Sequence, residues 1–155
     1  MAKEIEHKFL VRDDRWRDQV FRSTTLRQGY LVSDETRSVR VRVAGDKAYL
    51  NIKSATVGIS RNEYEYPIPV PEAEEILAHL CLPSIVEKTR HLVRYGDHVW
   101  EIDVFEGDNT GLIVAEVELA SADEAFERPP WVGDDVSHDL RYYNSYLAQC
   151  PYKDW

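Results

Sequence analysis

The chain has 155 residues and is 43% hydrophobic, which is enough for an ordinary core and predicts a single domain spanning residues 1–155. Its 28 acidic and 19 basic residues give a net charge of -9, which argues against binding to nucleic acid or to an anionic membrane, and no apolar run approaches the ~18 residues typical of a membrane span. The two cysteines make no disulfide framework and no zinc-site spacing with the five histidines, so we expect a reducing, cytoplasmic setting.

The first predicted element is a strand at residues 3–11, "KEIEHKFLV", whose side chains alternate as they do in a half-buried strand. Glu4, Glu6 and Lys8 share one face of this strand, and the opposite face is mainly apolar. A short helix is predicted directly after it, over residues 13–20, because an aspartate can cap its first turn and two apolar residues follow at helical spacing.

The middle of the chain follows the two-residue period of strands. Four strands joined by polar or glycine-containing turns are predicted at residues 25–32, 37–43, 48–54 and 61–68. A helix is predicted over residues 71–80, because Pro71 suits a first turn, acidic residues lie near its start and apolar residues share one side. Three further strands are predicted at residues 85–95, 98–106 and 112–120.

Two more helices are predicted near the end of the chain. A capping box at residues 121–124 predicts the start of a short helix. The tail at residues 137–149 spaces Leu140, Tyr143 and Leu147 by three and four, which predicts a closing helix. About eight strands, about four helices and mostly hairpin connections indicate an α+β domain with an antiparallel sheet, and eight strands are enough to close a barrel.

The charged residues of these strands are sorted by sign. Acidic pairs at positions i and i+2 are Glu4 and Glu6, Glu63 and Glu65, Glu101 and Asp103, and Glu116 and Glu118. The basic residues of the same faces are Lys8, Arg40, Arg42, Lys53, Lys88 and Arg90. Faces of this kind are ordinarily exposed to solvent. However, like charges spaced about 6.5 to 7 Å apart repel each other, and the opposite faces are bulky enough to need a cover.

If the sheet curls so that its charged faces point inward, the interior holds eight acidic and six basic residues. Buried unpaired ions cost several kcal/mol each, so such an interior must be wet and cross-paired, or built around a ligand of matching charge. The basic residues suit an anion with several phosphates, and the carboxylates suit Mg²⁺ or Mn²⁺. The charged faces therefore indicate a metal–polyphosphate site.

The stretch "EIEHK" resembles the Glu-x-Glu-x-Lys motif of the CYTH superfamily, the triphosphate tunnel metalloenzymes. The stretches "RSVRVR", "LNIKS", "RNEYEY", "EKTR", "EID" and "AEVEL" follow in the family's order, so the resemblance covers residues 3 to about 119. The tail "LRYYNSYLA" is similar to the family's terminal helix. The chain is most similar to the short bacterial inorganic triphosphatases. It departs from many members at Ser54, where they have glycine.

The resemblance implies an eight-stranded antiparallel β-barrel, a tunnel with a charged interior, flanked by about four helices. It also implies that the tunnel binds a triphosphate with Mg²⁺ or Mn²⁺, and two ions are expected. The metal ligands that it implies are Glu4, Glu6 and Glu116 for one ion and Glu101, Asp103 and Glu118 for the ion near the attacking water. The phosphate-binding residues that it implies are Lys8, Arg40, Arg42, Lys53, Lys88 and Arg90.

The sequence leaves alternatives for proton transfer and for the supporting residues of this site. Either Lys8 or Lys88 would assist proton transfer, while Glu101 and Asp103 would act through the water. Glu63 and Glu65 would position the basic residues or share in metal binding. Tyr30 either reaches the ligand or packs within its strand.

The first functional hypothesis is a hydrolase that converts inorganic tripolyphosphate to pyrophosphate and phosphate by metal-activated water, because no obvious insertion would recognise an organic group. The alternatives are a class IV adenylyl cyclase, a thiamine triphosphatase using Trp100, Trp131 or Trp155 as an aromatic seat, and a non-catalytic polyphosphate-binding module. The expected partner is a small-molecule triphosphate, with no nucleic acid and no membrane. A homodimer stays open.

Overall fold

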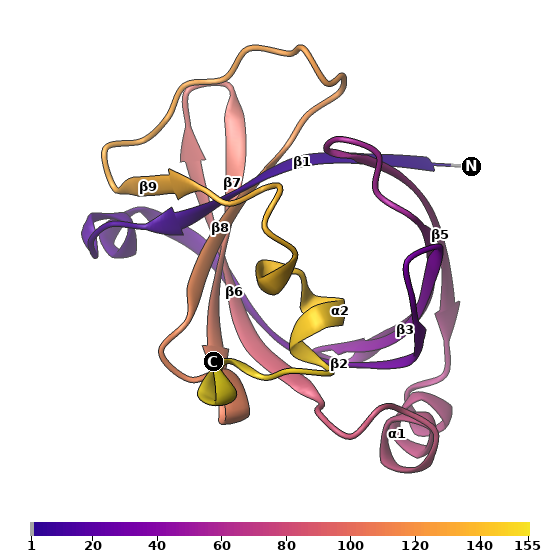
Figure 1. Cartoon of the computed structure of the whole chain (residues 1–155). Coiled ribbons are helices and arrows are strands. Elements are labelled where there is room, and N and C mark those ends of the chain that lie inside the picture. The colour runs from indigo at the N-terminus through magenta and orange to yellow at the C-terminus, as the bar shows by residue number, and fades with distance from the viewer. Residues whose placement is uncertain (1) are drawn as a thin grey trace.

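The computed structural model describes residues 2–155, and strands dominate it (Figure 1). The strands are β1 Ala2–Val11, β2 Val20–Ser33, β3 Arg37–Ala44, β4 Lys47–Ser54, β5 Ser60–Ile68, β6 Val86–Tyr95, β7 His98–Glu106, β8 Ile113–Glu118 and β9 Val132–Asp135. The first eight are ordered β5-β4-β3-β2-β6-β7-β8-β1, and β1 also pairs with β5. The predicted eight-stranded antiparallel barrel is therefore confirmed.

The closure of the barrel depends on β1, which has different partners along its length. Residues 2–5 pair with β5 and residues 6–10 pair with β8, both antiparallel. Residues 9 and 11 also pair with β9, a short strand that the sequence did not predict. The N-terminal strand thus lies between β8 and β5, the two ends of the sheet formed by the other seven strands, and closes the barrel.

The expectation of about four flanking helices was wrong. In residues 2–155 the α-helices are α1 Val70–His79 and the four-residue α2 Asn144–Leu147. The short 3₁₀ helices are η1 Arg15–Gln19, η2 Gly107–Asn109, η3 Leu140–Tyr142 and η4 Tyr152–Asp154. None of these helices is long and apolar enough to cross a membrane.

The capping box at residues 121–124 forms a turn instead of opening a helix. Glu124 accepts a hydrogen bond from the Ala120 amide (2.7 Å), as in a cap, but the backbone leaves helical geometry directly afterwards. Pro129 and Pro130 follow within a few residues, and proline disfavours a helical conformation in the residue before it. The segment runs as a loop over the outside of the barrel (Figure 1).

The predicted closing helix over residues 137–149 is broken into η3 and α2. Ser137 does not cap a helix, because its hydroxyl accepts the backbone N–H of Lys8 at 2.9 Å. Tyr143 between the two pieces is extended (φ -79°, ψ 136°), and its hydroxyl donates to the Ser137 carbonyl at 3.0 Å. These contacts with the barrel override the helical spacing of the tail. Leu140, expected on the apolar side, is 67% exposed.

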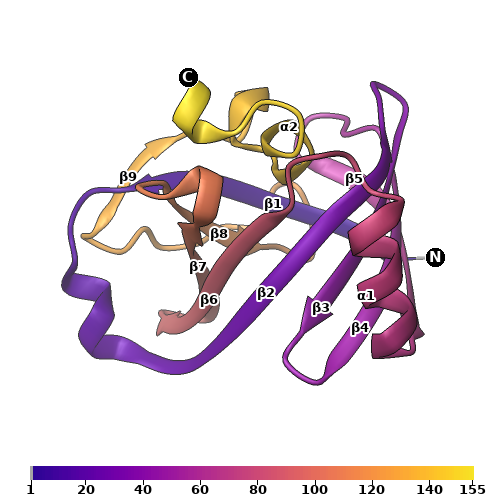
Figure 2. The same cartoon turned by 90° about the horizontal axis from the view of Figure 1, so that it is seen from below.

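The apolar residues pack mainly on the outside of the barrel, in two covered regions. Helix α1 lies along β3 and β4 (Figure 2), where Ala73 and Leu77 cover Val41 and Val43. The other region covers β1, β7 and β8, with Phe9, Trp16, Trp100 and Trp131 in one buried cluster. Because the apolar faces point outward into these layers, the opposite faces of the same strands line the interior.

Trp100 is the centre of the second region. It is fully buried, its ring packs edge-on against Trp131 with ring centroids 5.8 Å apart, and it packs in a tilted arrangement against Phe9 with ring centroids 5.5 Å apart. Trp100→Ala is expected to lower the free energy of unfolding by about 3–5 kcal/mol, because it leaves a large cavity. Urea unfolding measures this loss. The control Val99→Ala, at a 43% exposed neighbour, should stay within about 0.5 kcal/mol of the unchanged protein. Equal losses for the two variants would contradict this packing.

Candidate active site

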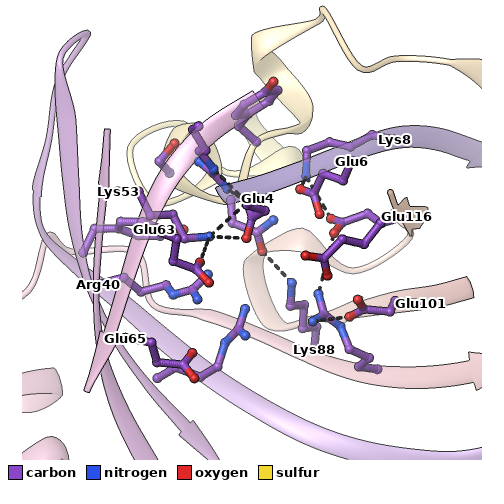
Figure 3. Close-up of a pocket in the computed structure, with 18 residues that line it drawn as sticks. Glu4, Glu6, Lys8, Arg40, Lys53, Glu63, Glu65, Lys88, Glu101 and Glu116 are labelled. Atoms are coloured by element: carbon purple, nitrogen blue, oxygen red, sulfur yellow. Dashed lines mark hydrogen bonds and ion pairs between the residues drawn. The ribbon is translucent and has the colours of Figure 1, made fainter. Parts of the chain in front are cut away.

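The interior of the barrel contains a cavity of ≈ 150 Å³ lined by 18 residues, nearly all of them polar (Figure 3). Its seven basic residues are Lys8, Arg40, Arg42, Lys53, Arg61, Lys88 and Arg90. Its seven acidic residues are Glu4, Glu6, Glu63, Glu65, Glu101, Glu116 and Glu118. The cavity wall therefore balances its charges, whereas the whole chain carries -9.

The structure brings together nearly all the residues that the sequence singled out. The six predicted phosphate-binding residues all line the cavity, and so do Glu63, Glu65 and Tyr30. Of the predicted metal ligands, Glu4, Glu6, Glu101, Glu116 and Glu118 line it as well. The strand alternation explains this, since each of these side chains lies on the face opposite the outer apolar layers.

Asp103 is the exception, because it lies behind the cavity wall. It is fully buried, and its two oxygens accept hydrogen bonds from Lys88 Nζ (2.6 Å) and from Arg90 Nε and Nη2 (2.8 and 2.9 Å). The two arginine contacts form a bidentate pair, which fixes the guanidinium in orientation as well as in position. This geometry favours a role for Asp103 in positioning Lys88 and Arg90. It argues against the predicted role of Asp103 as a metal ligand.

One group of charges in the cavity is centred on Glu4. Its carboxylate pairs with Lys53 (3.2 Å) and Arg61 (2.7 Å), and Glu63 pairs with the same lysine at 3.0 Å. Burial raises the pKa of Glu4, but Lys53 and Arg61 outweigh burial and hold this pKa well below its usual range. Burial, together with repulsion from Arg40 and Arg61, lowers the pKa of Lys53 to about 8. The group therefore contains a stable carboxylate and an ammonium that is easily neutralised.

A second group joins β1 to β8. Lys8 Nζ lies 3.1 Å from Glu6 and 2.9 Å from Glu116. Burial and the neighbouring Glu116 raise the pKa of Glu6 to about 8. Burial lowers the pKa of Lys8, but Glu116 and Glu6 outweigh burial and raise this pKa above its usual value. Two acids thus share one lysine, which is held firmly in its charged form.

A third group surrounds Lys88, the most deeply buried lysine of the cavity at 1% exposure. Its Nζ donates to Asp103 (2.6 Å) and to the side-chain oxygen of Asn144 (2.8 Å). Burial, against the attraction of Asp103 and with repulsion from Arg90 and Arg42, lowers the pKa of Lys88 to about 7. Lys88 therefore differs from Lys8 in that its surroundings lower its pKa, whereas those of Lys8 raise it.

Several cavity residues were not predicted from the sequence, and Arg61 is the clearest of them. Arg61 is the first member of an alternating row with Glu63 and Glu65 in "RNEYEY", so the same two-residue period was a signal for it. Tyr143, Asn144 and Ser145 also line the cavity from the C-terminal segment. No sequence signal separates these three residues from a packing helix.

The carboxylates fit a hard divalent cation by donor type, since Mg²⁺ and Mn²⁺ prefer oxygen ligands. The pair Glu6–Glu116 is the strongest observation, because both carboxyl groups converge on the Lys8 nitrogen at 3.1 and 2.9 Å, so two oxygen donors lie side by side there. Within residues 2–155, no three acidic, histidine or cysteine side chains lie together as a ready-made metal site. The cavity carboxylates instead contact lysines and arginines.

Comparison with known proteins gives consistent matches over almost the whole chain. The CYTH domain family matches residues 2–146. An inorganic triphosphatase of Acetivibrio thermocellus is 46% identical over 155 residues, covering 100% of this chain and 99% of that protein. An inorganic triphosphatase of Nitrosomonas europaea is 40% identical, covering 94% of this chain and 96% of that protein. The crystal structure of the inorganic triphosphatase NE1496 superimposes with a TM-score of 0.70 at 37% identity, covering 96% of this chain and 95% of its own.

Proposed function

The chain belongs to the CYTH domain family, and from this premise we propose that it is an inorganic triphosphatase, which hydrolyses tripolyphosphate to pyrophosphate and phosphate. The observation that carries the proposal is the closed barrel whose cavity is lined by seven basic and seven acidic side chains. The full-length similarity to two inorganic triphosphatases supports the same reaction. The chain is thus a hydrolase acting on phosphoanhydride bonds.

The size and lining of the cavity favour an inorganic substrate over an organic one. Its volume of ≈ 150 Å³ is about half the lower limit of roughly 300 Å³ for ordinary small-molecule sites. Tyr30 and Tyr143 are its aromatic lining residues. Trp100 and Trp131, considered as an aromatic seat for thiamine, lie buried in the outer core, and the Trp155 ring packs against Tyr152. A nucleobase or a thiamine ring therefore has no prepared seat in the described cavity.

The basic residues supply most of what phosphoryl transfer requires, which is positioning and charge neutralisation. Arginine offers paired donors that match phosphate oxygens, while lysine offers a compact charge. The substrate takes over contacts that the cavity carboxylates now make with these groups. A divalent metal, when bound, neutralises the phosphates further and lowers the pKa of a bound water.

Of the two lysines left open by the sequence, Lys88 is the better proton acceptor. Lys8 contacts two carboxylates that hold it charged, whereas Lys88 contacts one carboxylate and one amide. The lowered pKa of Lys88 agrees with this geometry. In this assignment Lys88 takes the proton of the attacking water, and Lys8 stays a phosphate-binding charge.

CYTH triphosphatases depend on a divalent metal. We propose more specifically that this chain uses Mg²⁺ or Mn²⁺ and binds two ions. Glu4, Glu6 and Glu116 would hold one ion, and Glu101 and Glu118 would hold the other. A cytoplasmic setting agrees with the two free cysteines of the chain.

Metal removal tests the proposal. The purified protein with Mg²⁺ or Mn²⁺ and tripolyphosphate should release orthophosphate. An excess of chelator should stop the release, and added metal should restore it. Release that is unaffected by the chelator would contradict the metal, and no release under any condition would contradict the triphosphatase.

Arg61 provides a test of the phosphate-binding wall. Arg61→Ala is expected to raise KM for tripolyphosphate by about 10–100-fold, because a hydrogen bond to a charged group contributes about 1.5–3 kcal/mol. Arg27→Ala is the matched control, since Arg27 pairs with Glu74 of α1 on the outside of the barrel. Steady-state kinetics of both variants measure the difference. An unchanged KM for Arg61→Ala would exclude Arg61 from substrate binding.

A further inference from the structure

The C-terminal segment fills one end of the barrel interior. α2 lies within the outline of the ring of strands in Figure 1 and at one end of the barrel in Figure 2. Leu147 and Ala148 are 0% and 1% exposed and pack in one cluster with Val86, Phe105 and Val114. Val86 and Val114 share their strand faces with the cavity residues Lys88 and Glu116, and Phe105 shares its face with Asp103 behind the cavity wall. The interior therefore has a charged centre and an apolar end, and the apolar end anchors α2.

The docking of α2 places Asn144 against the charged centre. The side-chain oxygen of Asn144 accepts hydrogen bonds from Lys88 Nζ (2.8 Å) and from Gln28 Nε2 (3.1 Å). The oxygen of Gln28, which is fully buried, accepts in turn from Arg42 Nε at 2.9 Å. One asparagine oxygen thus connects the C-terminal segment to a lysine and, through one glutamine, to an arginine.

This arrangement fixes the direction in which the Lys88 nitrogen points. An amine nitrogen has positions for three hydrogens, or for two hydrogens and one lone pair in the neutral form. Asp103 and Asn144 are both acceptors, so each takes one hydrogen. The remaining position, hydrogen or lone pair, is left for the cavity that Lys88 lines. Without Asn144, the nitrogen keeps one acceptor and can rotate about its terminal bond.

We propose that Asn144 is a positioning residue of the triphosphatase reaction, which orients Lys88 directly and Arg42 through Gln28. The inference rests on the proposed function and deepens it. It makes the docked C-terminal segment a part of the site, so that the basic groups are fully oriented when α2 occupies the end of the barrel.

The test compares three variants of the full chain. Asn144→Ala is expected to lower kcat by about 10–100-fold with a smaller change in KM, because misplacement of a reacting group costs up to about 100-fold. Asn144→Asp keeps an acceptor oxygen in place but gives Lys88 a second carboxylate, which favours its charged form, so kcat should recover only at higher pH. The added negative charge should also raise KM. Gln149→Ala, from the same segment and exposed, is the control and should behave as the unchanged protein.

Two further readouts separate positioning from a merely structural role. Thermal unfolding should show Asn144→Ala still folded, because Leu147 and Ala148 remain to anchor α2. In a double-mutant cycle, Asn144→Ala should cost less when Lys88 is already replaced by methionine, because the contact between Asn144 and Lys88 is then already lost. If the fold-losses in kcat of the two single variants simply multiply in the double variant, the proposal is wrong.

Failure of this inference is distinguishable from failure of the proposed function. If the unchanged protein hydrolyses tripolyphosphate and Asn144→Ala keeps its kcat, the positioning role of Asn144 is wrong and the triphosphatase stands. If Asn144→Asp is as impaired in kcat as Asn144→Ala at every pH, the acceptor oxygen is not what matters and the inference is also wrong. If the unchanged protein hydrolyses no tripolyphosphate, the proposed function itself fails.

Discussion

Lys88→Met is expected to lower kcat for tripolyphosphate by about 10²–10⁴-fold, the usual contribution of a positioned general base. Methionine has a similar length and no proton-accepting nitrogen. The fold is expected to survive, because Asp103 keeps its bidentate contact with Arg90 at 2.8 and 2.9 Å when Lys88 is removed. The buried carboxylate is therefore not left without a partner, which would otherwise be strongly destabilising.

Lys88→Arg separates the two roles that Lys88 can have. Arginine keeps the positive charge but is not deprotonated in proteins. If Lys88 accepts the proton of the attacking water, Lys88→Arg should be about as slow as Lys88→Met. Recovery of kcat by arginine would instead assign Lys88 to charge neutralisation. Lys8→Arg is the matched comparison, because two carboxylates hold Lys8 in its charged form. Lys8→Arg should therefore retain more activity than Lys88→Arg.

Glu6→Gln is expected to raise the Mg²⁺ or Mn²⁺ concentration needed for half-maximal activity by at least about tenfold. The neutral amide has nearly the same shape as the carboxyl group and can still accept the hydrogen bond from Lys8 Nζ, but it removes one anionic oxygen donor from the pair. The metal should also stabilise the unchanged protein against heat, because a ligand at 100 times its Kd contributes about 2.7 kcal/mol. This rise in Tm should be reduced or absent in Glu6→Gln.

The control for Glu6→Gln is Glu72→Gln, which makes the same chemical change at an exposed position in the first turn of α1. It should leave both the metal requirement and the rise in Tm unchanged. Equal metal responses of Glu6→Gln and the unchanged protein would exclude Glu6 from metal binding. The Tm readout does not depend on turnover, so it tests the metal ligand even in a slow variant.

The sequence predicted the barrel wall well, because strand alternation is a local property. Each charged face could be assigned from its own strand, and the sorting of acids and bases indicated that these faces meet. The pairing of β1 with β5, which closes the barrel, depends instead on contacts about 60 residues apart, such as Glu4 opposite Arg61. Closure of the barrel could therefore be expected only from the number of strands and from the family resemblance.

The C-terminal segment could not be predicted because contacts distant in sequence decide its conformation. The spacing of Leu140, Tyr143 and Leu147 is helical, yet Ser137 bonds to Lys8, which is 129 residues away. That contact and the extended Tyr143 break the helix and direct Asn144 inward. Helical spacing identifies residues that can share a face, but it does not say whether a barrel interior accepts them.

Asp103 shows the same limit at the level of a single side chain. The alternation of β7 correctly placed it on the inner face with Glu101. Its register opposite Arg90 and its contact with Lys88 then hold it behind the cavity wall. Because cross-strand register is not readable from one strand alone, an inward carboxylate cannot be assigned to a metal or to a neighbouring base from the sequence.

A substrate panel with separate product detection tests the central claim most directly. The purified protein with Mg²⁺ or Mn²⁺ is given tripolyphosphate, ATP and thiamine triphosphate, and orthophosphate and cyclic AMP are measured independently. The account predicts the highest kcat/KM for tripolyphosphate, with orthophosphate as product and no cyclic AMP from ATP. Cyclic AMP formation, or a clear preference for an organic triphosphate, would contradict it.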